Sequence, residues 1–162
     1  MQERVLDPAD DTRAIEQLKY RYVRLLDTKQ WDGFADCFTA EATGDYNGLA
    51  FADPSALVAY MREHLVDGII TLHQVHHPEI TLDPDDPDLA TGRWYLQDKV
   101  IVPAFDFILE GAAFYEDRYR RTADGWRIAH TGYARTYELT WSLADLPSAK
   151  VGGPGTHTHA DA

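Results

Sequence analysis

The spacing of apolar residues changes near residue 70, and this change constrains the fold more than any other feature of the chain. Before it, apolar side chains recur every three or four positions, which predicts helices over about 14–26, 31–38 and 54–68. After it, strand-like segments run over about 71–82, 89–101, 109–121 and 126–138. Helices followed by an antiparallel meander predict an α+β fold, in which the helices pack on one face of the sheet. Strands of about twelve residues would span roughly 40 Å if they were flat, so we expect strong curvature.

Composition describes a single globular domain with few candidate partners. The chain has 162 residues and a formal net charge of -12, which argues against nucleic acid and membranes as partners. Cys37 is the only cysteine, so no intrachain disulfide can form and a reducing compartment is favoured. The first residues lack the apolar run of a signal peptide, and no segment reaches membrane-spanning length. We therefore expect a cytoplasmic domain over residues 1–146 and a flexible tail over 147–162.

A carboxylate interrupts an apolar row in the second predicted strand. Trp94, Leu96, Asp98 and Val100 alternate onto one face of that strand. A charged group in such a row is costly to bury unless it has a partner. A salt bridge to a neighbouring strand explains Asp98 about as well as a functional role does.

Two residues of the first predicted helix lead to different expectations. Tyr22 lies on the apolar stripe, so its hydroxyl faces the interior, where a core tyrosine with one hydrogen bond is the simpler interpretation. Asp27 follows Val23 around the helix, so helix geometry alone predicts a surface residue at the helix end. From these positions alone, neither residue is assigned to a site.

Histidines cluster in the first predicted strand. His73 and His77, with His76 between them on the other face, lie about 13 Å apart, which is too far for one metal ion. We therefore predict no metal site there, and His157 and His159 in the tail are most simply solvated. His73 can act as an acid or base near neutral pH, or can be a structural histidine.

An arginine stands between two tyrosines in the last predicted strand. Arg135 shares a strand face with Tyr133 and Tyr137, where it could form an ion pair at the rim or anchor a carboxylate or phosphate. The chain contains no Gly-rich phosphate loop, nucleophile elbow or Cys-x-x-Cys pair. An acid, a base and a cation without a nucleotide motif point to proton chemistry on a small organic molecule.

Five segments carry a resemblance to a known superfamily. They are AIEQLKYRYVRLLD (14–27), LHQVHHPEI (72–80), ATGRWYLQD (90–98), AAFYEDRY (112–119) and GYARTYE (132–138). In this order and spacing they resemble the SnoaL-like, or nuclear-transport-factor-2-like (NTF2-like), superfamily over roughly residues 10–142. Within it the chain is most similar to bacterial bile acid 7α-dehydratases and more distantly to scytalone dehydratase. The resemblance implies a cone-shaped α+β barrel, with N-terminal helices packed on a strongly curved, mostly antiparallel sheet around a pocket.

The resemblance also implies which residues form the site. The catalytic set that it implies is Tyr22, Asp27, His73, Asp98 and Arg135, and the substrate-contacting set is Tyr46, Trp94 and Tyr115. The family's catalytic histidine matches His73, and the aspartate that pairs with it matches Asp98. The match also moves Asp27 into the site, against the helix-face argument.

The reaction implied is an elimination of water that needs no cofactor, which would make the protein a carbon–oxygen lyase. The substrate would be a 7α-hydroxy-3-oxo-4-ene steroid of the bile acid type, as the free acid or its coenzyme A thioester. In this hypothesis His73 moves the protons, and Asp98 fixes its tautomer. Tyr22, helped by a second pocket tyrosine, would hydrogen-bond the ketone oxygen. Asp27 would orient a tyrosine or join the proton transfer, and Arg135 would organise the carboxylates or meet the acidic tail of the substrate.

Two alternatives stay open at this point. The same cone could carry a different acid–base enzyme, such as a polyketide cyclase, an isomerase or a dehydratase of a smaller ring system. It could also be a non-catalytic binding module, although burying Asp98 and His73 without a task has a cost. Relatives suggest a homo-oligomer, either a trimer or a dimer.

Overall fold

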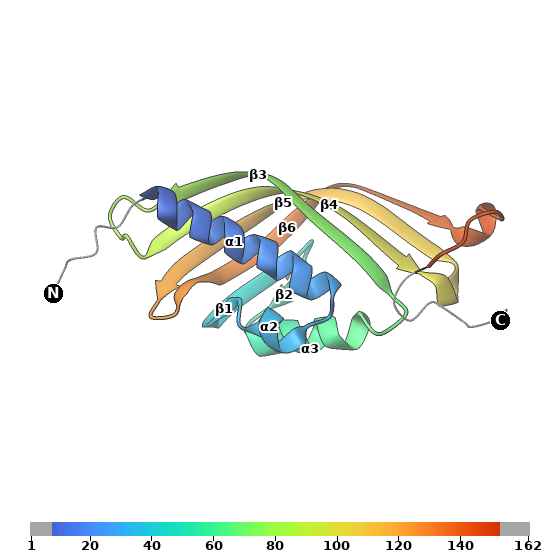
Figure 1. Ribbon diagram of the computed structural model, residues 1–162, viewed down its shortest axis with the longest axis horizontal. Helices are drawn as coiled ribbons and strands as arrows, with labels where there is room; N and C mark the ends of the chain where they lie inside the picture. Colours follow the sequence, from blue (N-terminus) through green and yellow to red (C-terminus); the bar gives the residue numbers. More distant parts are fainter. Residues whose placement is uncertain (1–7, 153–162) are drawn as a thin grey trace.

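A computed structural model of the chain describes residues 8–152. In chain order its elements are α1 (Pro8–Asp27), α2 (Trp31–Ala35), β1 (Phe38–Tyr46), β2 (Leu49–Phe51), α3 (Pro54–His64), β3 (Ile70–Leu82), β4 (Leu89–Val102), η1 (Pro103–Phe105), β5 (Phe107–Thr122), β6 (Gly125–Ser142) and η2 (Leu143–Asp145). Figure 1 shows α1 lying along one side of the sheet, with α2 and α3 gathered next to β1 and β2. This arrangement confirms the predicted α+β fold, with helices on a mostly antiparallel, curved sheet.

The first helix is longer than its apolar spacing predicts. It begins at Pro8, because proline is tolerated in the first turn of a helix, and Asp10 and Asp11 in that turn suit the positive end of the helix dipole. Its buried residues beyond that turn are Ile15, Leu18, Lys19, Tyr22, Val23 and Leu26. This stripe holds α1 against β3 and β6, and each fully buried aliphatic side chain contributes ~1.5–3 kcal/mol to that packing.

The strands form one sheet in the order β2-β1-β6-β5-β4-β3. All neighbours are antiparallel except β1 and β6, which run parallel, with Phe38 opposite Ile128. Apolar spacing predicts neither β1 nor β2, and the helix that it places over 31–38 ends at Ala35. The helix prediction is wrong at Phe38 because that residue joins a strand distant in sequence, for which local spacing carries no signal.

A tight turn joins β1 to β2 and orients the end of β1. Asn47 and Gly48 both have positive φ angles, 53° and 94°, which is the backbone that a two-residue hairpin requires and that Asn-Gly favours. The side chain of Asp45 accepts a hydrogen bond from the Gly48 backbone at 2.7 Å. Tyr46, the last residue of β1, is thereby held with its side chain buried.

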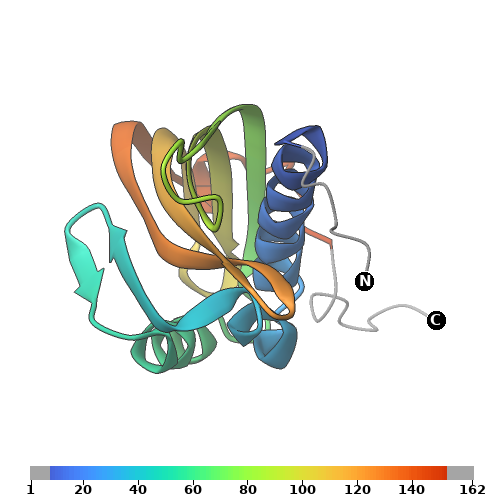
Figure 2. The ribbon, with the colours of Figure 1, turned by 90° about the vertical axis from the view of Figure 1, so that its left-hand side faces the viewer.

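Bulges curve the sheet, as expected from the length of its strands. The pairing of β3 with β4 shifts between His76 and Glu79, where His77 takes a φ angle of 46°. After this bulge Ile80 returns to the sheet face that carries His73. Figure 2 shows the sheet curling around the side on which α1 lies, which creates the concave face of the cone.

A close approach explains one glycine of β6. A Cβ atom on Gly132 would lie 2.7 Å from the backbone oxygen of Asp45 in β1, a distance that real Cβ atoms do not adopt. The parallel pairing of β1 with β6 therefore depends on glycine at this position.

The C-terminal end is described only in part. Residues 147–152 follow η2, whereas 153–162, which hold most of the predicted tail with His157 and His159, lie outside the described residues. No helix within residues 8–152 combines the length and the apolar character that crossing a membrane would require.

Candidate active site

Asp27 and His73 form a hydrogen-bonded pair where the end of α1 meets the start of β3. One oxygen of Asp27, Oδ1, accepts from Nδ1 of His73 at 2.7 Å and from the hydroxyl of Thr71 at 2.8 Å. The other, Oδ2, accepts from the backbone N–H of His73 at 2.9 Å. Both side chains are largely shielded from solvent, with 13% of His73 and 18% of Asp27 exposed.

These hydrogen bonds define the chemistry of the imidazole. An ionised carboxylate only accepts hydrogen bonds, so its contact assigns the proton of neutral His73 to Nδ1 and leaves Nε2 as the basic nitrogen. The bond to the His73 backbone ties the carboxylate to the same residue whose ring it orients. A neutral imidazole held in this way can remove a proton from a carbon acid and return it.

Asp27 therefore is not the surface residue that helix geometry alone predicts. It is the last residue of α1, and α1 packs along β3, so the helix end reaches Thr71 and His73 on that strand. Helix geometry alone does not predict this position, because the groups that bond to Asp27 come from β3, which lies beside the end of the helix.

Asp98 does not hold the ring of His73, and this corrects the pairing that the resemblance implied. The two residues are direct cross-strand partners in the pairing of β3 with β4. The carboxylate of Asp98 instead receives two hydrogen bonds from Arg135, each 2.8 Å long. The planar guanidinium offers two parallel donors that match both carboxylate oxygens, whereas an imidazole offers one.

A glycine makes the contact between Asp98 and Arg135 possible. Arg135 comes from β6, two strands away from Asp98, and its guanidinium crosses β5 at Gly111, where a Cβ atom would contact it. The hydrogen bond to Asp98 raises the pKa of Arg135 further above its ordinary value, and Glu138 contacts its Nε at 2.9 Å. The guanidinium of Arg135 thus lies between two carboxylates of this chain, Asp98 and Glu138, and a contact with a substrate carboxylate stays a prediction.

Four tyrosines form a contiguous group, here called the tyrosine cluster: Tyr22, Tyr46, Tyr115 and Tyr133. The hydroxyls of Tyr22 and Tyr46 are 2.6 Å apart, and the ring of Tyr46 stacks on that of Tyr133 with centroids 5.2 Å apart. Tyr115 makes edge contacts with Tyr22 and Tyr133. The guanidinium of Arg135 lies 5.5 Å from the Tyr133 ring, which connects the cluster to the pair of Asp98 and Arg135.

Burial determines the protonation of these phenols. It raises the pKa of Tyr22, Tyr46 and Tyr115 above the ordinary value of a tyrosine. All three are therefore neutral hydrogen-bond donors at neutral pH. Such donors suit an oxygen that becomes negative during a reaction.

Trp94 packs beside Tyr115 in the interior of the fold. It is fully buried, stands opposite Tyr115 in the pairing of β4 with β5, and donates its indole N–H to the hydroxyl of Tyr119 at 2.9 Å. Its substrate contact stays a prediction.

A buried ion pair beneath the tyrosine cluster was missed in the sequence. Lys19 of α1 and Asp117 of β5 are both fully buried, with Nζ 2.7 Å from Oδ2. A signal for Lys19 existed, because it lies four positions after Ile15 and three before Tyr22, on the apolar stripe. The alternation of β5 places Asp117 on the face of Tyr115 in the same way.

The other histidines of β3 lie away from the pair. His76 stands opposite Tyr95, which is on the outer face of the sheet, and His77 occupies the bulge. Within residues 8–152 no group of three histidine, cysteine or acidic side chains is arranged to hold a metal ion.

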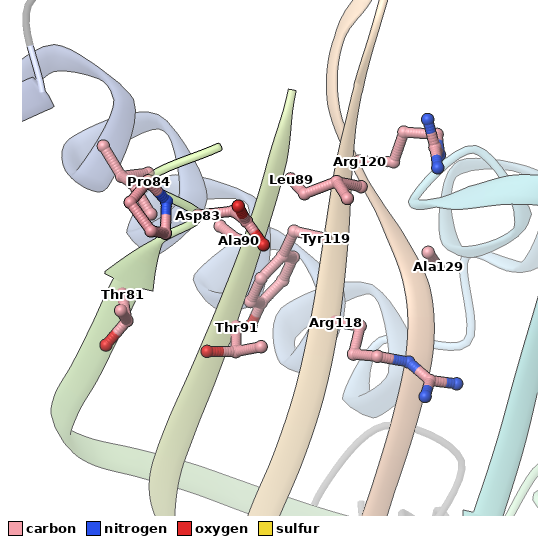
Figure 3. Close-up of a pocket in the computed structure, with 11 residues that line it drawn as sticks. Thr81, Asp83, Pro84, Leu89, Ala90, Thr91, Arg118, Tyr119, Arg120 and Ala129 are labelled. Atoms are coloured by element: carbon pink, nitrogen blue, oxygen red, sulfur yellow. The ribbon is translucent and has the colours of Figure 1, made fainter. Parts of the chain in front are cut away.

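A hollow on the outer face is also separate from the pair. Figure 3 shows it on the side of the sheet turned away from α1, lined among others by Thr81, Thr91, Arg118 and Arg120, with a volume of about 420 Å³. Thr81 is eight residues from His73 along β3, or about 25 Å in an extended strand. The hollow belongs to a different part of the surface.

The fold and the pair define a class: a small α+β cone domain with a shielded histidine–carboxylate pair at the end of its first helix. The chain belongs to the SnoaL-like domain family, whose sequence profile matches residues 7–132. This membership confirms the superfamily that the five sequence segments indicated.

Solved structures of similar proteins share the fold. A hexachlorocyclohexane dehydrochlorinase, LinA type 2, matches with a TM-score of 0.73 at 15% identity, over 91% of this chain and 96% of its own. A candidate scytalone dehydratase from Novosphingobium aromaticivorans DSM 12444 matches with a TM-score of 0.71 at 15% identity, over 94% and 97%. An NTF2-like protein with a cystatin-like fold from Novosphingobium aromaticivorans matches with a TM-score of 0.65 at 20% identity, over 79% and 83%. At these identities the likeness establishes the fold, and a closer relation to bile acid 7α-dehydratases stays a prediction.

Proposed function

We propose that this protein is a lyase that eliminates water from a hydrophobic hydroxy-ketone without a cofactor, with His73 as its base. The observation that carries the proposal is the hydrogen bond from Nδ1 of His73 to Asp27, which leaves Nε2 as a basic nitrogen. The neighbouring tyrosine cluster adds neutral donors for an oxygen that gains charge. The names of two structurally similar proteins, a dehydrochlorinase and a candidate dehydratase, both denote eliminations and support this class of reaction.

In the proposed reaction, one proton moves from a substrate carbon to His73 and then from His73 to the departing hydroxyl. Nε2 of His73 removes a proton from the carbon next to the one that bears the hydroxyl. The electron pair of the broken C–H bond moves through the enone to the ketone oxygen and forms a dienolate, which a tyrosine donor stabilises. As these electrons move back, the C–O bond breaks and the hydroxyl leaves as water with the proton held by His73. The products are water and a conjugated dienone, and His73 returns to its starting form.

The substrate that we propose is a 7α-hydroxy-3-oxo-4-ene steroid. An apolar hollow of about 330 Å³, lined by residues that include Val66, Ile69, Val102 and Phe105, supports a hydrophobic ligand. The hollow includes the loop directly before β3, and the backbone oxygen of Ile69 there accepts a hydrogen bond from Lys29, two residues after Asp27. It therefore adjoins the part of the fold that carries the pair of Asp27 and His73.

A spectroscopic assay tests this function. A 7α-hydroxy-3-oxo-4-cholenoic acid and its coenzyme A thioester are offered separately, and the red-shifted absorbance of the 4,6-dien-3-one product is followed. Replacing His73 with alanine should lower turnover by ~10²- to 10⁴-fold, the usual contribution of a general base. The matched control is His76→Ala on the outer face of the same strand, which should retain turnover. Near-normal turnover in His73→Ala would contradict the assignment of the base, and no turnover with either steroid would direct the search to smaller ring systems.

We also propose that the protein assembles as a dimer or trimer in the cytoplasm. Large apolar side chains are exposed on the outer face of the sheet, among them Leu72, Tyr95, Tyr137 and Leu139. A second copy could cover this face, since exposed apolar surface of this kind often marks an interface. Light scattering on the purified protein would measure the assembly, and a monomer at micromolar concentration would contradict it.

A further inference from the structure

A fully buried ion pair lies next to the tyrosine cluster and has no part in the proton transfer described above. Nζ of Lys19 is 2.7 Å from Oδ2 of Asp117, and neither side chain is exposed. The same carboxylate oxygen accepts from the hydroxyl of Tyr119 at 2.7 Å, and that hydroxyl accepts from the indole of Trp94. The pair is therefore anchored on both α1 and β5.

Stability alone does not account for this pair. Two charges lose their hydration when they are buried, and replacing such a pair by apolar residues of similar size is often neutral or stabilising. The second oxygen of Asp117 has no hydrogen-bond partner within residues 8–152, so the pair is not even fully satisfied. Charged groups kept inside a protein at such a cost are frequently part of a functional site.

The position of the ammonium suggests what the pair does. Nζ of Lys19 lies 3.3 Å from the ring centroid of Tyr115 and 4.5 Å from that of Tyr22. Burial lowers the pKa of Lys19, but the adjacent carboxylate of Asp117 and two aromatic faces each favour the charged form. A positive charge against these rings favours negative charge on their phenol oxygens and so makes their hydroxyls stronger donors.

A hydrogen bond connects Tyr22, whose ring lies against the ammonium of Lys19, to Tyr46 on the less buried side of the tyrosine cluster. The hydroxyls of Tyr22 and Tyr46 are 2.6 Å apart. Burial has the larger effect on the pKa of Tyr46 and raises it, whereas the hydrogen bond from Tyr22 lowers this pKa and so makes Tyr46 a stronger donor. Tyr46 is 7% exposed, compared with 0% for Tyr22 and 1% for Tyr115. Tyr133, whose ring stacks on that of Tyr46, is only half-buried, so Tyr46 and Tyr133 form the side of the cluster that lies closest to solvent. Asp117 by itself acts in the opposite direction, because its charge adds to the effect of burial in raising the pKa of Tyr46.

We propose that Lys19 and Asp117 are positioning residues that make the tyrosine cluster select an oxyanion, an enolate or phenolate oxygen, over the corresponding neutral oxygen. Asp117 holds the ammonium of Lys19 against the tyrosine rings, and the ammonium strengthens the donors that face the ligand. The inference deepens the proposed function, since the dienolate of the proposed elimination carries such an oxygen. It assigns the origin of oxyanion binding to a pair that contacts no substrate.

A binding experiment tests this selection without any turnover. The probe is 4-nitrophenol, whose ionised form alone absorbs visible light, and the reference is 4-nitroanisole, its methyl ether, which cannot ionise. At a fixed pH the visible absorbance of the bound probe gives the ratio of affinities for phenolate and phenol. The wild-type protein should favour phenolate. In Lys19→Met/Asp117→Asn, which removes both charges and keeps an acceptor for Tyr119, this ratio should fall about tenfold, as one pKa unit of the bound probe. Binding of 4-nitroanisole should change little.

The controls separate electrostatics from packing. Arg121→Met/Asp11→Asn removes a second shielded ion pair, which lies at the other end of α1 against the ring of Trp126, and should leave the ratio unchanged. Tyr22→Phe keeps the ring under Lys19 but removes the hydroxyl that polarises Tyr46, so it should also lower the ratio. This variant decides the question if the charge-free double variant fails to fold.

Each outcome bears on the proposal. An equal ratio in wild type and Lys19→Met/Asp117→Asn, or in wild type and Tyr22→Phe, overturns it, as does a wild-type protein that binds phenol and phenolate equally or binds neither. His73→Ala should keep the phenolate preference, because His73 is not part of the cluster. Failure of the elimination assay would therefore leave this inference standing, and the converse also holds.

Discussion

Replacing Asp27 with asparagine should disable His73 while leaving its ring in place. The carboxylate accepts three hydrogen bonds, from Nδ1 of His73 at 2.7 Å, from the hydroxyl of Thr71 at 2.8 Å and from the His73 backbone at 2.9 Å. Asparagine has one oxygen, and its NH₂ group only donates. Whichever way the amide turns, its NH₂ group faces a nitrogen that previously donated to the carboxylate.

The orientation of the new side-chain amide in Asp27→Asn decides whether turnover or stability is lost. With its oxygen on the His73 backbone N–H, the NH₂ group faces Nδ1, and His73 adopts the tautomer with its proton on Nε2. The nitrogen that should accept the substrate proton then already carries one. The equivalent exchange in the serine protease triad lowers kcat by ~10⁴, which corresponds to ~5 kcal/mol of transition-state stabilisation. The opposite turn sets two donors against each other, at a cost in stability of ~1–3 kcal/mol.

Two measurements together test this reasoning. Turnover in the dienone assay should fall by about 10⁴ in Asp27→Asn, and nitrogen NMR of the imidazole should show the proton of neutral His73 moving from Nδ1 to Nε2. Asp98→Asn is the matched control, because Asp98 stands opposite His73 but bonds to Arg135, so the His73 tautomer should not change. Turnover within a factor of about ten of wild type, with the tautomer unchanged, would refute the assignment of Asp27 as the partner of the base.

Two further predictions concern stability. Arg135→Met leaves the carboxylate of Asp98, which is 4% exposed, without its partner, and should lower the free energy of unfolding measured in urea by ~3 kcal/mol. Arg135→Met/Asp98→Leu should recover most of this loss. No recovery would show that the unpaired charge does not cause the loss. Burial lowers the pKa of His130, so its imidazole binds a proton more readily in the unfolded chain than in the folded protein. The contribution of His130 to stability should therefore be constant above about pH 6.5 and decrease as the pH falls below this value. His130→Asn should remove this part of the pH dependence in urea titrations, and an identical pH dependence in both proteins would contradict the assignment.

Local spacing in the sequence predicted the elements that carry their own periodicity. The first helix, the third helix and the strands β3 to β6 all repeat their apolar residues over long stretches, and each appears close to its predicted position. The two strands within residues 38–51 were not predicted. The sequence of β1 lacks such a repeat, and β1 becomes a strand because it pairs with β6. The early start of α1 at Pro8 was missed because its first turn is polar.

The site shows the same division at the level of single residues. The apolar row around Asp98 correctly indicated a carboxylate that needs a partner, and the resemblance selected Asp27 and His73 from positions that are ambiguous in isolation. Neither the apolar row nor the resemblance could show which carboxylate bonds to His73 and which bonds to Arg135. Asp27 and Asp98 both reach the neighbourhood of His73, and the outcome depends on Arg135 crossing β5 at Gly111.

The sequence by itself determined the family, the order of α1, α3 and the strands β3 to β6, and most of the residue types of the candidate site. Only the tertiary structure decided the pairs: Asp27 with His73, Asp98 with Arg135, and Lys19 with Asp117. The physical reason is that helix and strand periods act over a few neighbouring residues, whereas a hydrogen bond or an ion pair depends on distances of about 3 Å between groups far apart in the chain. Those distances exist only after the helices have packed on the curved sheet.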